Sequence, residues 1–147
     1  MASTPVRRDW VIRPGTSDDV DAVLALWRAA DAEPSVTDDA LSLRALIAHD
    51  RDALIVADRA GAIIGSIVAG FDGWRGNLYR LAVDPGFRRR GLALELTAAA
   101  EQRLVSRGCR RASALVLLDH RDAVGFWEAA GFTRQERIGR YIKNLGT

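Results

Sequence analysis

Hydrophobic and polar residues follow two different periods along the first part of the chain. Residues 9–15 (DWVIRPG) alternate between the two classes and end in Pro14-Gly15, which predicts a short first strand. From residue 16 the apolar spacing changes to three and four residues, which predicts a helix over residues 16–30. The apolar stripe of this helix consists of Val20, Val23, Leu24 and Trp27.

Polar residues mark the starts of two helices. Thr16 can act as an N-cap, and Asp19 three residues later completes a capping-box variant with Asp in place of Glu. The polar stretch EPSVTDD (33–39) then interrupts the helical pattern. A second helix is predicted to begin at Thr37 and to run to about His49.

Three apolar stretches follow and predict an antiparallel meander. ALIVAD (53–58) and AIIGSIVAGFD (62–72) are joined by the turn RAG, the pattern of a β-hairpin. After the loop GWRGN, LYRLAV (78–83) predicts a third strand, which ends at Pro85 and Gly86.

The second half alternates helical and extended patterns. A strong helical pattern covers residues 91–107, with Gly108 as the residue that ends it. RASALVLL (111–118) is too apolar for a half-exposed strand, so we expect it at the centre of the sheet. RDAVGFWEAAGF (121–132) predicts a short helix, and ERIGRYIKNL (136–145) predicts a last strand. This order predicts a mixed α/β (α+β) fold: a twisted sheet of antiparallel meander plus a parallel pair, flanked by about four helices.

Composition bounds the number of domains. With 147 residues, 48% of them hydrophobic, the chain predicts a single globular domain over residues 1–147. The charged fraction of 27% and the net charge of +2 do not suggest disorder, and we expect only residues 1–8 to form a flexible N-terminus. Lys143 is the single lysine, so the basic pI of about 9.2 comes from arginine. Arginine forks suit phosphate and carboxylate, although an arginine bias of the genome is the alternative explanation.

Several classes of protein are disfavoured. The N-terminus MASTPVRRDW lacks the apolar core of a signal peptide, and no apolar run approaches the ~20 residues that cross a bilayer. The single cysteine, Cys109, excludes an intrachain disulfide and a cysteine-cluster metal site. Two separated histidines do not make a ligand set, so we predict no metal. We therefore expect a cytoplasmic protein with no membrane partner.

Three arginines stand directly before the long helix, in DPGFRRRGLALEL (84–96). A helix N-terminus already carries positive charge, so cations there call for an anion. Gly91 lets the chain bend and small Ala93 permits close approach, which would leave backbone amides pointing at one spot. The stretch lacks the lysine ending of a P-loop and the three glycines of the dinucleotide fingerprint. It predicts an anion site built from backbone, with a solvated turn as the alternative.

The longer stretch LAVDPGFRRRGLALEL (81–96) resembles the acyl-CoA signature of the GNAT superfamily of N-acetyltransferases. The signature Gln/Arg-x-x-Gly-x-Gly/Ala is met by Arg88, Gly91 and Ala93. The resemblance extends over residues 10–144 and includes the order of elements and the late segment HRDAVGFWEAAGF. The turn GFDGWRG is similar to one in small bacterial members of the family.

This resemblance implies the GNAT fold and an N-acetyltransferase that moves an acetyl group from acetyl-CoA to a primary amine of a small molecule or peptide by direct attack. It implies that loop amides bind the CoA pyrophosphate and that the third meander strand hydrogen-bonds the pantetheine as an added strand would. The implied cofactor-binding residues are Leu81, Ala82, Val83, Arg88, Arg89, Arg90, Gly91, Leu92, Ala93 and Trp127. A non-catalytic acyl-CoA sensor with the same fold is the alternative.

Direct acetyl transfer needs a stabilised thioester oxygen and an acid for the departing thiolate. By the resemblance, a backbone amide near Leu81 would serve the oxygen. Trp127 stands where many relatives have a tyrosine acid, and an indole N–H does not release a proton near neutral pH. His120 is the candidate acid, because histidine exchanges protons near neutral pH. An exposed histidine beside a helix cap is the alternative reading, and Tyr141 is a further candidate.

The amine also needs a base, and none is obvious. Many relatives carry a glutamate near the start of the third meander strand, but GNLYRLAV contains none. Tyr79 could relay a proton through water. Asp72 lies nearby, although Asp72-Gly73 is more simply a turn dipeptide. We expect an ordered-water route with no dedicated strong base.

The segment DAEPSVTDD (31–39) would line the acceptor site by the same resemblance. Asp38 and Asp39 suit a first helical turn, whereas Asp31 and Glu33 do not. These two predict a cationic amine acceptor, with ordinary exposed loop carboxylates as the alternative. Nucleic acid is not expected, because one arginine turn lacks the spread of basic and aromatic residues that a strand needs. A monomer and a homodimer both stay open.

Overall fold

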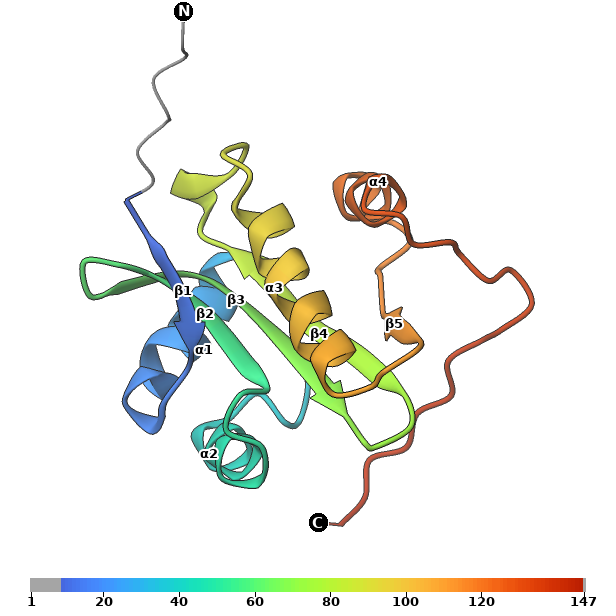
Figure 1. The fold of residues 1–147 in the computed structure, drawn as a ribbon, viewed down its shortest axis with the longest axis horizontal. Coiled ribbons are helices and arrows are strands. Elements are labelled where there is room, and N and C mark those ends of the chain that lie inside the picture. The colour runs from blue at the N-terminus through green and yellow to red at the C-terminus, as the bar shows by residue number, and fades with distance from the viewer. Residues whose placement is uncertain (1–8, 147) are drawn as a thin grey trace, which may run out of the picture. The chain divides into compact units, whose positions relative to one another are not determined.

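The computed structural model describes residues 9–146, which divide after Ala114 into two compact units. Within residues 9–114 the chain forms a five-stranded sheet and three α-helices (Figure 1). The second unit contains α4 (Arg121–Ala129). The single domain predicted for residues 1–147 stays a prediction, and the predicted flexible N-terminus lies outside the described residues.

The sheet follows the chain in its strand order, β1-β2-β3-β4-β5. The strands are β1 (Val11–Pro14), β2 (Leu54–Arg59), β3 (Ala62–Phe71), β4 (Gly76–Val83) and β5 (Ala112–Ala114). The pairs from β1 to β4 are antiparallel and the β4–β5 pair is parallel. The predicted meander and the predicted parallel pair are therefore confirmed.

Two helices cover opposite faces of this sheet: α1 (Val20–Ala29) and α3 (Leu92–Ser106). Successive residues of a strand point to opposite faces. On β3, a Cβ built on Gly65 would lie 2.9 Å from the Leu96 side chain of α3, whereas Ser66 accepts a hydrogen bond from Trp27 of α1 at 2.9 Å. The α1 face carries a buried apolar core of Val20, Val23, Leu26, Trp27, Leu43, Leu54, Val56, Val68 and Ala82.

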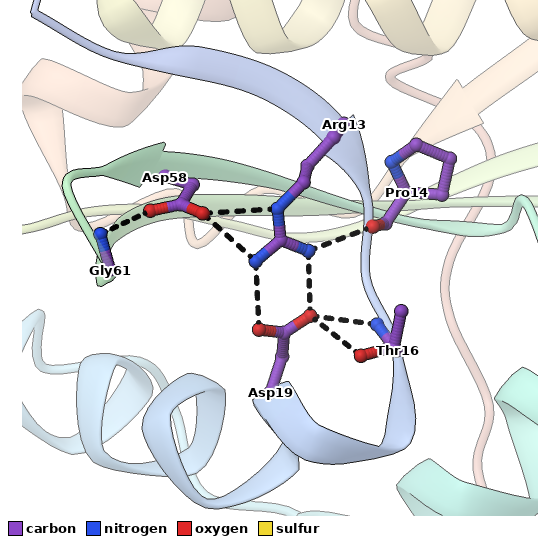
Figure 2. Close-up of polar contacts among 6 residues, drawn as sticks. All are labelled: Arg13, Pro14, Thr16, Asp19, Asp58 and Gly61. Carbon is purple, nitrogen blue, oxygen red and sulfur yellow. Dashed lines mark hydrogen bonds and ion pairs between the residues drawn. The ribbon is translucent and has the colours of Figure 1, made fainter.

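Arg13 of β1 ties the first strand to its neighbours (Figure 2). Its guanidinium donates to both carboxylate oxygens of Asp19 at 2.8 and 2.9 Å and to Asp58 of β2 at 3.2 Å. Asp19, at the end of the short helix η1 (Ser17–Asp19), also accepts the amide of Thr16 at 2.7 Å, so the predicted capping pair is confirmed. The hydrogen bond from Arg13 lowers the pKa of Asp19. This contact therefore stabilises the fold above the ordinary carboxylate pKa and is lost as pH falls through the lowered value.

A β-bulge interrupts β4. Tyr79 pairs with Val68 of β3, and Ala82 pairs with Ser66. Two residues of β4, Arg80 and Leu81, therefore lie opposite the single residue Ile67. Arg80 has a φ of +52°, in the left-handed region that residues other than glycine seldom adopt.

The prediction for residues 111–118 was wrong in position and in length. The strand β5 covers only three residues and lies at the edge of the sheet rather than at its centre. Leu115, Leu117 and Leu118 were expected to be buried, and they are exposed. An apolar run indicates a preference for burial, but it does not specify the neighbours that would bury it.

A predicted strand is missing, and the start of a predicted helix is shifted. Residues 136–145 do not form the predicted last strand, and Ile138 and Tyr141 are exposed there. An alternating pattern becomes a strand only when another strand pairs with it, and the second unit as described contains none. The second helix, α2 (Ala40–His49), begins three residues later than predicted, because Asp39 rather than Thr37 caps it by accepting the Ser42 amide at 2.7 Å.

Candidate active site

The loop that joins β4 to α3 is held at its entry by Asp84. The Asp84 carboxylate accepts the amide of Gly86 at 2.8 Å, and its carbonyl accepts the amide of Phe87 at 2.8 Å. The Asp84 amide donates to the carbonyl of Ile64 on β3 at 2.8 Å. These bonds form the short 3-10 turn η2 (Pro85–Phe87), so the entry of the loop is set by contacts of Asp84 and not by the arginines.

The exit of the loop leaves backbone amides open. Arg89 and Gly91 have φ values of +64° and +81°, which turn the chain into α3. A Cβ built on Gly91 would meet no atom within 4 Å. The first hydrogen bond of the helix runs from the Glu95 amide to the Gly91 carbonyl at 3.1 Å, so the amides of residues 92–94 have no acceptor within the helix. Open amides at a helix N-terminus, with space in front of them, fit a phosphate group.

Positive charge surrounds these amides. Arg88, Arg89 and Arg90 are exposed, and none of them forms an ion pair with a carboxylate of residues 9–146. The guanidiniums of Arg90 and of Arg59 on β2 both lie over the Phe87 ring, at 5.1 and 5.2 Å from its centre. The exposure agrees with the solvated-turn alternative as well as with an anion site. The open amides favour the anion site.

The edge of β4 that faces away from β3 is paired with another strand over only part of its length. Its parallel pairing with β5 ends where Leu78 meets Ala114. Residues 79–83 continue beyond that point with no strand partner on this edge in the described part of the chain. Ala82 is buried in the α1-side core, while Leu81 and Val83 are half-buried. A strand edge that leads straight into the anion loop is suited to an extended ligand that pairs like an added strand.

The two candidates for a base differ in their surroundings. Tyr79 of β4 is 43% exposed, so water reaches its side chain. Asp72 lies in the β3–β4 turn, where one carboxylate oxygen accepts the amides of Arg75 at 2.7 Å and Trp74 at 2.8 Å. These hydrogen bonds lower the pKa of Asp72 and thereby weaken it as a base. The turn interpretation of Asp72 is therefore the correct one.

The acidic segment before α2 is joined to the β4 bulge. Asp31 and Glu33 are exposed, and neither forms an ion pair within residues 9–146. Asp38, by contrast, accepts hydrogen bonds from the Arg80 guanidinium at 2.6, 2.8 and 3.1 Å. Sequence reasoning missed this pair, since Asp38 was explained as a residue of a first helical turn. The opposite charges 42 positions apart were the only signal for it.

The remaining predicted residues belong to the second unit. His120 is the N-cap residue of α4 and is exposed, and its side chain makes no capping hydrogen bond. Trp127 is buried and packs edge to face against Phe126 and Phe132, with ring centres 5.4 and 4.9 Å apart. Tyr141 is almost fully exposed.

Membrane-spanning helices and metal-binding clusters were also sought among the described residues. No helix within residues 9–146 has the length and apolar character to span a membrane. Over the same range, no cluster of three or more His, Cys, Asp or Glu side chains is arranged to hold a metal ion.

Comparison with known families and proteins decides what this arrangement belongs to. The model of the acetyltransferase (GNAT) family matches residues 20–132, which include the whole of the loop and the bulge. The chain belongs to the GNAT acetyltransferase family. It is 34% identical over 127 residues to acetyltransferase YE1169 of Yersinia enterocolitica, covering 86% of this chain and 90% of that protein. It is 37% identical over 117 residues to acetyltransferase ECA0875 of Pectobacterium atrosepticum, covering 80% and 83%.

Solved structures agree on the fold of this acetyltransferase. Aminoglycoside N-acetyltransferase AAC(6')-Iy in complex with CoA superposes with a TM-score of 0.72 at 24% identity, covering 97% of this chain and all of that one. The PaiA N-acetyltransferase of Thermoplasma acidophilum in complex with coenzyme A gives a TM-score of 0.78 at 15% identity, covering 90% and 94%. The GNAT fold and an acetyl-transferring enzyme, both expected from the sequence, are thus confirmed.

Proposed function

We propose that this acetyltransferase takes its acetyl group from acetyl-CoA and transfers it to a primary amine of a small molecule or peptide by direct attack. The observation that carries the proposal is the part of the β4 edge that has no strand partner among residues 9–146. This edge runs into a loop whose open amides and arginines find no acceptor or carboxylate in the same described range. An extended, anionic cosubstrate such as acetyl-CoA matches both halves of this surface. Two structural neighbours, AAC(6')-Iy and PaiA, were solved in complex with CoA, which supports the same choice.

Each part of the surface has a role in binding. The amides at the start of α3, from Gly91 through Ala93, bind the pyrophosphate, and Arg88 to Arg90 add charge around it. The backbone of Leu81, Ala82 and Val83 pairs with the pantetheine. The acetyl group then lies near the bulge, where the amide of Leu81 donates to the thioester oxygen as that oxygen gains charge. The family resemblance adds Trp127 as a further proposed cofactor-binding residue.

The transfer itself moves one acetyl group and two protons. The amine nitrogen bonds to the acetyl carbon, the carbon–sulfur bond breaks, and the electron pair stays on sulfur. The amine loses a proton to ordered water, with Tyr79 as a relay, since no strong base lies on β4. His120 is the proposed acid for the thiolate, and its imidazole is exposed and makes no capping hydrogen bond.

The acceptor is proposed to be cationic. Of the four carboxylates in residues 31–39, Asp38 is neutralised by Arg80 and Asp39 caps α2, which leaves Asp31 and Glu33 to attract a positive charge. Two aminoglycoside acetyltransferases, AAC(6')-Iy and meta-AAC0020, are among the structural neighbours, and the second was solved in complex with sisomicin. These neighbours support a polyamine, an aminoglycoside-like compound or a basic peptide N-terminus as the acceptor.

The test is release of CoA thiol from acetyl-CoA in the presence of a panel of amines, with mass spectrometry of the acetylated product. The panel pairs cationic amines with neutral amines of similar size, and a reaction without amine serves as the control. We expect release that depends on the amine and is faster with the cationic members. If acetyl-CoA binds in a calorimeter and no amine releases thiol, the non-catalytic sensor replaces the proposal.

A further inference from the structure

A chain of buried hydrogen bonds ends on the backbone of the β4 bulge. The indole Nε1 of Trp27 on α1 donates to the Ser66 hydroxyl at 2.9 Å, and that hydroxyl donates to the carbonyl of Arg80 at 3.1 Å. Trp27 is 5% exposed and Ser66 is 0% exposed, so water does not compete for either contact. A network of the core therefore terminates on a peptide of the candidate active site.

The side chain of the same bulge residue is held as well. The Arg80 guanidinium contacts Asp38 through three hydrogen bonds and lies 5.4 Å above the Trp27 ring. The side chains of Arg80 and Asp38 are each 20% exposed. A non-glycine residue in the left-handed region persists only where its surroundings support it. Here the support comes from both ends of Arg80, its carbonyl and its guanidinium.

The geometry of a peptide bond links this support to the next amide. The described residues contain no cis peptide, and in a trans peptide the C=O and the following N–H point in opposite directions. Because Ser66 holds the carbonyl of Arg80, the amide of Leu81 points away from the Ser66 hydroxyl. Arg80 and Leu81 both lie opposite Ile67 of β3, so Leu81 has no regular pairing partner of its own. The regular hydrogen-bond pattern between β3 and β4 therefore does not set the direction of the Leu81 amide.

We infer that Ser66 is a positioning residue that aims the Leu81 amide at the thioester oxygen. Trp27 supports Ser66 by donating a hydrogen bond to its hydroxyl, and Asp38 holds the Arg80 side chain. The inference rests on the proposed function, in which that amide stabilises the oxygen. A donor that is fixed before the reaction stabilises the developing charge without reorganising, and a small displacement loses much of the effect. Asp38 also joins the proposed acceptor segment to the side chain of the same bulge residue.

The first experiment compares the wild type with Ser66→Ala by infrared spectroscopy of bound acetyl-CoA carrying ¹³C at the thioester carbonyl. A hydrogen bond from the Leu81 amide lowers the carbonyl stretching frequency below that of free acetyl-CoA. We expect Ser66→Ala to lose a large part of this shift and about tenfold in kcat, while the Kd for CoA, which lacks the acetyl group, stays within about twofold.

A matched control removes a buried hydroxyl elsewhere. Thr97 on α3 is 2% exposed and donates to the carbonyl of Ala93 at 2.9 Å. Thr97→Val keeps the shape of the side chain and does not touch the bulge. We expect it to keep the wild-type carbonyl frequency, so a frequency change in Ser66→Ala alone is specific to the bulge.

The outcomes separate the inference from the proposed function. If acetyl-CoA binds to the wild type with an unshifted carbonyl, the role of the Leu81 amide fails, and the inference fails with it. If the wild type shows the shift and Ser66→Ala retains both the shift and kcat, the inference alone is overturned.

A second variant keeps the test open if Ser66→Ala does not fold. Asp38→Asn weakens the hold on Arg80 at a partly exposed position, and Asp39→Asn is its control, since it removes the same charge from the adjacent residue and retains a good N-cap. We expect a smaller frequency shift and a lower kcat in Asp38→Asn only. Equal behaviour of the two variants would overturn the part assigned to Asp38.

Discussion

The N-termini of α2 and α3 are built in opposite ways. At α2 the Asp39 carboxylate accepts the amide of Ser42 at 2.7 Å, so the chain itself satisfies the helix start. At α3 the first residue is preceded by Gly91, which has no side chain to cap with, and by three arginines that repel the helix dipole. A closed start contributes to stability, whereas an open start gives up that contribution and keeps its amides available. The comparison separates a helix start that stabilises the fold from one whose amides stay available for a ligand.

The start of α4 is a third case. His120 occupies the N-cap position, yet its side chain makes no capping hydrogen bond. The imidazole is therefore not committed to the helix, which agrees with the proposed role in proton transfer. The following changes test which helix starts serve stability and which serve chemistry.

The largest effect is expected at the open start of α3. Gly91→Asp should abolish measurable CoA binding, because the new carboxylate would occupy the space in front of the open amides and repel the phosphates. Gly91→Asn is the control, since asparagine has a similar size, tolerates a positive φ and carries no charge. Calorimetry with CoA, alongside circular dichroism of both variants, gives the measurement. A folded Gly91→Asp protein with wild-type affinity would refute the anion site.

A large loss of rate is expected at α4. If His120 protonates the thiolate, His120→Asn should lower kcat by about a hundredfold. Asparagine is a better N-cap than histidine, so the Tm should stay the same or rise. Activity and stability would then move in opposite directions, which a purely structural role cannot produce. An unaltered kcat would make His120 a bystander, and Trp127→Tyr would be the next variant to measure.

The acceptor segment should show a moderate effect on KM. The double change Asp31→Asn and Glu33→Gln should raise the KM of a cationic amine by about tenfold with little change in kcat, because it removes attraction and not chemistry. Added salt should shrink the difference, since exposed charges are screened over about 8–10 Å. Steady-state kinetics at two salt concentrations measures both. Equal KM values for the variant and the wild type would remove these two residues from the acceptor site.

The smallest effect is expected at the closed start of α2. Asp39→Ala should lower the Tm by a few degrees and leave the affinity for CoA unchanged. The amide of Ser42 lowers the pKa of Asp39, so the cap stabilises above the ordinary carboxylate pKa and fades as pH falls through the lowered value. Thermal melts should therefore converge for the two proteins at low pH. A loss of CoA affinity in Asp39→Ala would contradict the assignment of the α2 start to stability alone.

Local chemistry explains which parts of the fold were predictable. The meander and α3 carry their patterns within single stretches of sequence, and the turn around Gly91 is set by a glycine beside the helix it begins. The proposed anion site depends on backbone amides, whose direction follows from secondary structure alone. These parts could be predicted because neighbouring residues determine them.

Long-range pairing explains the rest. The Arg80–Asp38 contact joins residues 42 positions apart and depends on a bulge that no local pattern marks. The exposed stretch after β5 and the irregular residues 136–145 have suitable composition for strands, but the composition does not supply partners for them. The start of α2 was misplaced for a similar reason, since Thr37 and Asp39 are both good caps and only the final backbone path selects one.

The bulge pair also bears on how such an enzyme changes its substrates over evolution. Under the proposed function, cofactor recognition through backbone amides is largely indifferent to side-chain identity. The proposed acceptor segment, residues 31–39, is then the part that can be exchanged while cofactor binding is retained. Asp38 restricts that freedom, because it belongs to this segment and yet holds Arg80 of β4, the strand proposed to bind the cofactor. A segment transplanted from a relative with another acceptor should therefore work here only when it brings an acid to position 38, or when Arg80 is replaced together with it.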